Sequence, residues 1–202
     1  MYNQNMLRIL EDRFDHLQAY LFRVFDDTDD LYSFVAGIIY NKNQEDCKEM
    51  NSDGTPNPTG KIFRDKAKQF LLPVIAECGG ISGETIKYNQ KLIDILANRF
   101  DNIYSYLYTV FIGLCDAANT ADLYSDIAAI MYNKPQGTCK EMNPDGTPNP
   151  DGKDLRTRVK QFLLPVVIEC GGLFEEDKLS PEDAKKWAEE YKDMCINPNE
   201  VN

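Results

Sequence analysis

The feature of this sequence that most constrains its fold is a long internal repeat. Residues 40–80 and 132–172 align without a gap at an offset of 92, and a letter-by-letter count gives 29 identities over the 41 positions. This period is longer than the units of the common solenoid arrays. The repeat therefore predicts two copies of one small unit rather than an open array of short repeats.

The repeat continues upstream at a shorter offset. Arg13 aligns with Arg99, an offset of 99 − 13 = 86, so the second copy carries 92 − 86 = 6 additional residues between Phe111 and Asp122. We predict three segments from this alignment: a first helical unit at 1–82, a second helical unit at 83–174, and a C-terminal helix and tail at 175–202 that packs on the second unit.

Each unit has the apolar pattern of α-helices. Apolar residues recur every three or four positions, which is the spacing of one helix face. After the first helix of each unit a second helix is expected: Thr28 or Asp29 can cap it in the first unit, and Thr120 can open its counterpart in the second. The leading stripes are Leu7, Leu10, Phe14, Leu17, Leu21 and Val24 in the first unit, and Ile93, Leu96, Phe100, Ile103, Leu107 and Val110 in the second.

A third helix is predicted in each unit, from about Lys61 to Cys78 in the first. Pro73 and its counterpart Pro165 fall inside these helices. Proline removes one backbone hydrogen bond and crowds the preceding turn. We therefore expect a kink, or a break into two short helices, at both positions.

The segment after the second unit predicts one more helix. Ser180 can cap it, and its apolar face consists of Ala184, Trp187, Tyr191 and Met194. The predicted fold is all-α: two tandem homologous three-helix units related by a pseudo-twofold axis, plus a C-terminal helix, held together by disulfides.

The cysteines follow the repeat, and their symmetry predicts how they pair. Six cysteines allow 15 disulfide connectivities. A bridge already present in the ancestral unit would be kept in both copies, and the two cysteines outside the repeat would then pair with each other. The predicted bridges are Cys47–Cys78, Cys139–Cys170 and Cys115–Cys195. Disulfides favour an oxidising, extracytosolic location; the alternative is six reduced thiols in a cytoplasmic helical protein.

A loop rich in Asn, Asp, Gly and Pro is almost identical in the two units. Its oxygen-bearing side chains alternate along the chain and precede a glycine, as at the start of an EF-hand calcium loop. The candidate Ca²⁺ ligands are Glu49, Asn51, Asp53 and Asn57 in the first unit, and Glu141, Asn143, Asp145, Asn149 and Asp151 in the second.

The resemblance to a calcium loop then fails at its end. Position 12, which should be a bidentate glutamate, falls on Gly60 and Gly152. Prolines, glycines and Asx side chains also build rigid turns without any metal. We favour the rigid-turn interpretation and expect no cofactor, with Ca²⁺ as the alternative.

The sequence lacks the residue patterns of common catalytic sites. It contains a single histidine, His16, and no zinc-protease, phosphate-loop or nucleophile-elbow motif. We interpret His16 as a surface or cap residue rather than a catalytic base, because the aligned position in the second unit is Asn102. We therefore favour a protein that is not an enzyme, with an enzyme built from carboxylates and tyrosines as the alternative, and we assign no catalytic residue.

Charge narrows the range of partners. The chain has 22 Lys+Arg against 33 Asp+Glu, a net charge of −11, which argues against nucleic-acid binding. We also expect no transmembrane segment, and the start of the chain does not resemble a secretory signal. Our hypothesis is a secreted helical protein that binds a protein partner or assembles with itself. The alternatives are a carrier of a small hydrophobic ligand in a pocket between helices, and the Ca²⁺-dependent module.

Overall fold

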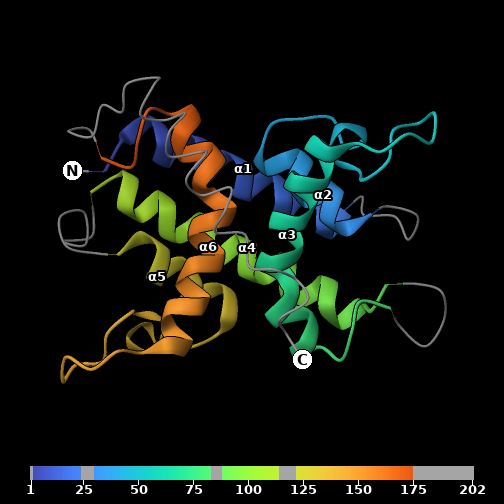
Figure 1. Cartoon of the computed structure of the whole chain (residues 1–202). Coiled ribbons are helices and arrows are strands. Elements are labelled where there is room, and N and C mark those ends of the chain that lie inside the picture. Colours follow the sequence, from blue (N-terminus) through green and yellow to red (C-terminus); the bar gives the residue numbers. More distant parts are fainter. Residues whose placement is uncertain (1, 24–29, 83–87, 114–121, 175–202) are drawn as a thin grey trace.

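The structure is a computed structural model that describes residues 2–23, 30–82, 88–113 and 122–174 (Figure 1). Within these ranges the chain is helical, with isolated β-bridges in place of strands, so the all-α prediction is confirmed. The predicted C-terminal helix, Cys115 and Cys195 lie outside the described residues. The elements are α1 (Gln4–Arg23), α2 (Leu31–Ile39), η1 (Glu45–Cys47), α3 (Pro58–Glu77), α4 (Gln90–Phe111), α5 (Leu123–Tyr132), η3 (Gln136–Cys139) and α6 (Pro150–Glu169).

Helices α1 and α4 pack along one another at the centre of the molecule. Their apolar stripes are buried as the sequence predicts, except for Val24, which lies outside the described residues. Phe14 of α1 and Phe100 of α4, which the offset of 86 makes equivalent, approach with ring centroids 5.8 Å apart. The burial of these two stripes explains why both helices form.

Helices α3 and α6 meet at a second pair of equivalent residues. Phe70 and Phe162, related by the offset of 92, are fully buried and stack with ring centroids 4.0 Å apart. The hydrophobic core is continuous from the first half of the chain (residues 2–82) to the second half (residues 88–174).

Of the kink or break expected at the two internal prolines, the break does not occur. Helix α3 continues through Pro73 to Glu77. Proline at 73 leaves the carbonyl of Gln69 without its helical donor, and Arg158 Nη1 from α6 donates to that oxygen at 3.3 Å. The same exchange occurs at Pro165, where Lys66 Nζ lies 3.5 Å from the carbonyl oxygen of Gln161. A cation from the opposite half thus replaces the lost hydrogen bond.

Other contacts between the halves are also reciprocal. Arg13 pairs with Glu169 at 3.0 Å, and the equivalent Arg99 pairs with Glu77 at 2.8 Å. At the chain start, Asn3 N donates to Leu173 O at 2.9 Å, which brings the beginning of α1 beside the end of α6 (Figure 1). Each half therefore supplies contacts that the other half requires.

The second helix of each half begins later than predicted. Asp30 caps α2 by accepting from Tyr32 N, and Asp122 caps α5 by accepting from Ser125 N, so the caps proposed at Thr28, Asp29 and Thr120 were wrong. Asp30 takes this role because its carboxylate is also bound by side chains of α2 and α3, as described below.

Candidate functional site

The repeated loop is fastened to the start of the third helix. Asn57, a predicted calcium ligand, is instead the N-cap of α3: its side-chain oxygen accepts from Gly60 N at 2.9 Å, and its Nδ2 donates to Asp46 O at 3.3 Å. Gly60 fits here because a Cβ at this position would lie 2.3 Å from the carbonyl oxygen of Lys48. The loop therefore lies directly against the helix backbone.

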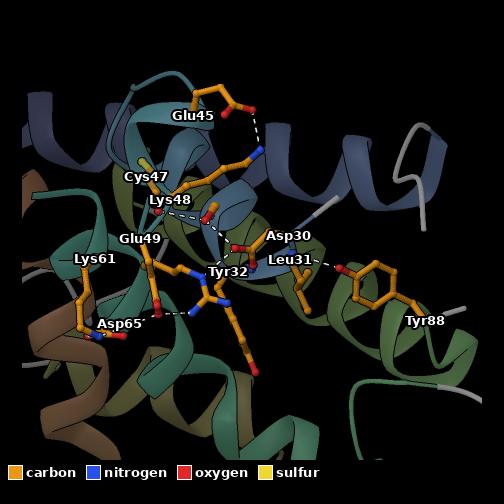
Figure 2. A network of polar contacts seen from close by, with 12 residues as sticks. Asp30, Leu31, Tyr32, Glu45, Cys47, Lys48, Glu49, Lys61, Asp65 and Tyr88 are labelled. Carbon is orange, nitrogen blue, oxygen red and sulfur yellow. Dashed lines mark hydrogen bonds and ion pairs between the residues drawn. The ribbon is translucent and has the colours of Figure 1, made fainter. Parts of the chain in front are cut away.

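Arg64 of α3 joins the loop to the start of α2. Its Nε donates to Asp30 at 2.7 Å and its Nη1 donates to Glu49 at 2.9 Å. Figure 2 shows Asp30 and Glu49 turned toward this point from α2 and from the loop. Ser33 Oγ completes the network by donating to Asp30 at 2.8 Å.

The network shifts the acidity of Asp30. Burial raises the pKa of this carboxyl, but the hydrogen bonds from Arg64 and Ser33 outweigh burial and hold the pKa below 3.8. The guanidinium also lies over the ring of Tyr32, 4.9 Å from its centroid. This half-buried arginine bonds two carboxylates and one ring, and so connects three chain segments.

The second half repeats this network residue by residue. Arg156 binds Asp122 and Glu141, and Ser125 Oγ donates to Asp122 at 2.8 Å. Asn149 caps α6 by accepting from Gly152 N at 3.1 Å. Structural bonds thus account for the near-identity of the two loops. Figure 1 shows the loops projecting from opposite corners of the molecule.

The predicted calcium ligands near the tip of each loop also have partners within the protein. Asn51 Nδ2 donates to Thr55 Oγ1 at 2.9 Å, and Asp53 accepts from Thr55 N at 2.9 Å; Asn143 and Asp145 bind Thr147 in the same way. The described residues hold no cluster of three or more His, Cys, Asp or Glu side chains able to bind a metal ion. Asp151 lies in the first turn of α6. The calcium site stays a prediction.

The predicted disulfides within each unit are not formed in the structure. Cys47, Cys78, Cys139 and Cys170 are free thiols. Cys47 lies beside the first turn of α3 and Cys78 caps its other end. At 1.5 Å per residue these ends are about 27 Å apart, whereas a disulfide needs Cα atoms within about 7 Å. Symmetry alone therefore misassigned the partners of Cys47 and Cys139.

A groove between α1 and α2 is the most pronounced concave site found in the described structure, with a volume of about 960 Å³. We call it the α1–α2 groove. Its apolar side chains include Tyr20 and Phe34, whose rings stack with centroids 3.8 Å apart. The complete lining is Arg8, Ile9, Asp12, Arg13, His16, Ala19, Tyr20, Arg23, Phe34, Gly37, Ile38, Asn41, Lys42 and Gln44.

The groove is basic although the chain is acidic. Arg8, Arg23 and Lys42 are exposed at its rim. Asp12, the only acidic residue of the lining, lies against His16, whose Nδ1 is 3.5 Å from the carboxylate. His16 is exposed, as the sequence predicts.

The equivalent surface of the second half has a different chemistry. Asp126 stands where the first half has Phe34. Its carboxylate accepts from Tyr106 Oη at 2.6 Å and also from Gln136 Nε2, so a polar network joins α4, α5 and η3. At the rim, Asp94 and Thr109 stand in place of Arg8 and Arg23.

The α1–α2 groove was not predicted from the sequence. A pocket between helices was expected only as an alternative and without named residues, and the basic rim was missed. A usable signal was present: Arg8, His16 and Arg23 are three positions at which the two halves differ in charge or size along one helix face.

Comparison with known proteins adds no family. No family model, no curated protein and no solved structure matches the chain. In the part of the chain that the structure describes, no helix is both long enough and apolar enough to span a bilayer. The groove itself is therefore the main indication of function.

Proposed function

We propose that this protein is a non-enzymatic binding protein that holds a protein partner in the α1–α2 groove. The observation that carries the proposal is the combination of apolar side chains with a basic rim in this groove, on a chain whose net charge is −11. Concave sites with an apolar lining and a few polar groups are the usual binding sites of proteins.

The openness of the groove favours a protein partner. Six of its lining residues are exposed: Arg8, Asp12, His16, Arg23, Asn41 and Lys42. Small-molecule sites cover most of the ligand surface, whereas a protein segment can lie in an open groove and keep one face in solvent.

A carrier of a small hydrophobic molecule is the second candidate. It is supported by the stacked rings of Tyr20 and Phe34 in the lining and by a volume within the range of ligand pockets. Native mass spectrometry of gently isolated protein distinguishes the two, because a carrier retains a small molecule of constant mass.

We further propose that the two halves descend from one duplicated unit, and that the unit once acted as a symmetric pair. The reciprocal ion pairs Arg13–Glu169 and Arg99–Glu77 support this origin.

The secreted location was predicted because disulfides form in oxidising compartments. The free thiols at Cys47 and Cys78 instead favour the cytoplasmic alternative.

Site-specific photocrosslinking tests the proposed function. A benzoylphenylalanine replaces Ile38, which lines the groove, or in the control Ile130, which is the equivalent residue of the second half. After irradiation in an extract of the producing cells, we expect discrete heavier species from the Ile38 variant alone. Equal products from both variants, or none from either, would contradict binding through the groove.

A further inference from the structure

We propose that the occupant of the α1–α2 groove is an acidic amphipathic α-helix of the partner protein. This inference rests on the proposed function and names the chemistry of the bound segment. The helix would place carboxylates at the basic rim and its apolar face against the floor of the groove.

The dimensions of the groove suit a helix. Its lining on α1 extends from Arg8 to Arg23, which corresponds to about 22 Å at 1.5 Å per residue, or about four turns of a partner helix. The opposite wall comes from α2, where Phe34 and Ile38 are one turn apart. Two helices that form a groove offer ridges on which a third helix packs, and amphipathic helices bind such grooves through side chains spaced three or four residues apart.

The positive charge of the rim favours a partner segment that is negatively charged. Arg13 is already neutralised by Glu169 at 3.0 Å. Arg8 and Arg23 are exposed at the two ends of the α1 wall, and Lys42 is exposed on the loop after α2. A strip of cations on a chain of net charge −11 attracts carboxylates locally while the rest of the surface repels other acidic proteins.

We expect one partner helix per chain, because the equivalent surface of the second half differs from the groove. Its equivalent surface has Asp94 and Thr109 at the positions of Arg8 and Arg23. The carboxylate of Asp126, which replaces Phe34, is bonded to Tyr106 there. That surface therefore lacks two cations of the rim and the stacked aromatic pair of the first half.

The second half shows which residues can replace the rim cations of the first half without disturbing the fold. In the double variant Arg8→Asp/Arg23→Thr, each new residue is the one that occupies the equivalent position of the second half. The matched control is Lys91→Asp/Lys153→Thr, which makes the same change in net charge at exposed positions outside the groove. Circular dichroism and thermal unfolding establish that both variants fold.

The test is a fluorescence-anisotropy titration of the full chain with synthetic helical peptides about four turns long. One peptide has a leucine face flanked by glutamates, a second has lysine in place of every glutamate, and a third has glutamine. We expect the acidic peptide to bind with one site per chain and to weaken as salt rises. The double groove variant should weaken this binding about tenfold or more, and the control less than about twofold.

Several outcomes would overturn the inference. Equal binding of the glutamine or lysine peptide would show that charge does not select the occupant, while the proposed function would stand on the Ile38 crosslink. Failure of the acidic peptide to bind, or equal weakening by the control variant, would also reject the acidic helix. Anionic phospholipid vesicles that bind the protein and lose binding in the groove variant, with no peptide bound, would assign the groove to a membrane surface.

Discussion

The ring of Phe70 stacks on the ring of Phe162, with an interplanar angle of 8°. The backbone at both residues is held as well: Tyr132 Oη donates to Phe70 O at 3.1 Å, and Tyr40 Oη donates to Phe162 O at 2.8 Å. This contact joins the two halves at the centre of the core, so its loss should destabilise both halves.

We predict that Phe70→Ala and Phe162→Ala each lower the free energy of unfolding by about 3–5 kcal/mol, because each leaves a cavity where a fully buried ring was. Chemical denaturation measures both values. The double variant should cost less than the sum of the two single variants, since both remove the same stacking contact. Full additivity would show that the rings act independently.

Substitution of Gly60 by alanine should destabilise the loop. The new Cβ would lie 2.3 Å from the carbonyl oxygen of Lys48, so the loop or the helix must shift; we expect a loss of about 1–3 kcal/mol. Gly152→Ala should behave alike, since its Cβ would lie 2.2 Å from Lys140 O. Gly137→Ala is the control, because its Cβ would contact nothing within 4 Å. Similar losses at all three glycines would point to a general effect of glycine replacement.

Stability should fall in acid through Asp30 and Asp122. Although burial raises the pKa of each carboxyl, hydrogen bonds from arginine and serine hold both below 3.8 in the folded protein. The unfolded chain then binds protons first, so this stabilisation is present above about pH 4 and disappears as the pH falls through the folded pKa. The free energy of unfolding can be measured by denaturant titration between neutral pH and about pH 3. It should fall less with acid in the double variant Asp30→Asn/Asp122→Asn than in the exposed control Asp101→Asn.

Stability should also fall in alkali. Burial raises the pKa of Tyr40 and Tyr132 well above 10.0, and burial raises the pKa of Cys47 from 9.0 to about 11. These groups ionise more readily in the unfolded chain, so the stabilisation is complete below about pH 9 and declines as the pH rises. Denaturation midpoints across this range test the sign. Tyr40→Phe should cost about 1 kcal/mol at neutral pH and show a smaller alkaline decline.

All four described cysteines should react as free thiols. In denatured protein that has not been reduced, we expect alkylation of Cys47, Cys78, Cys139 and Cys170, read by peptide mass spectrometry. In native protein the partly exposed Cys78 and Cys170 should react before the buried pair. Labelling that appears only after reduction would restore the predicted bridges.

The all-α fold could be predicted because helix periodicity is a local property of the sequence. The two apolar stripes to which Phe14 and Phe100 belong are buried as predicted. The capping role of Asn57 was also accessible, since an asparagine followed by proline is a common helix start. It was missed because the same letters also fit a metal loop.

The long-range contacts could not be derived from one sequence. Helix periodicity does not indicate which half supplies the ion-pair partner of Arg13. That partner is Glu169, 156 residues away in the sequence. Symmetry identified Cys47 and Cys78 as equivalent to a second pair, but it contains no distance, and a helix of 20 residues separates them. The groove likewise depends on how α1 and α2 pack.

The continuous chain has a consequence for the α1–α2 groove that a pair of identical subunits would not allow. In a symmetric homodimer every substitution appears twice, so a residue that improves one binding surface also changes its twin. Here Phe34 and Asp126 occupy equivalent positions, one stacked against an aromatic ring and the other bonded to a tyrosine hydroxyl. A single gene that encodes both halves can keep one as scaffold while the other acquires a ligand.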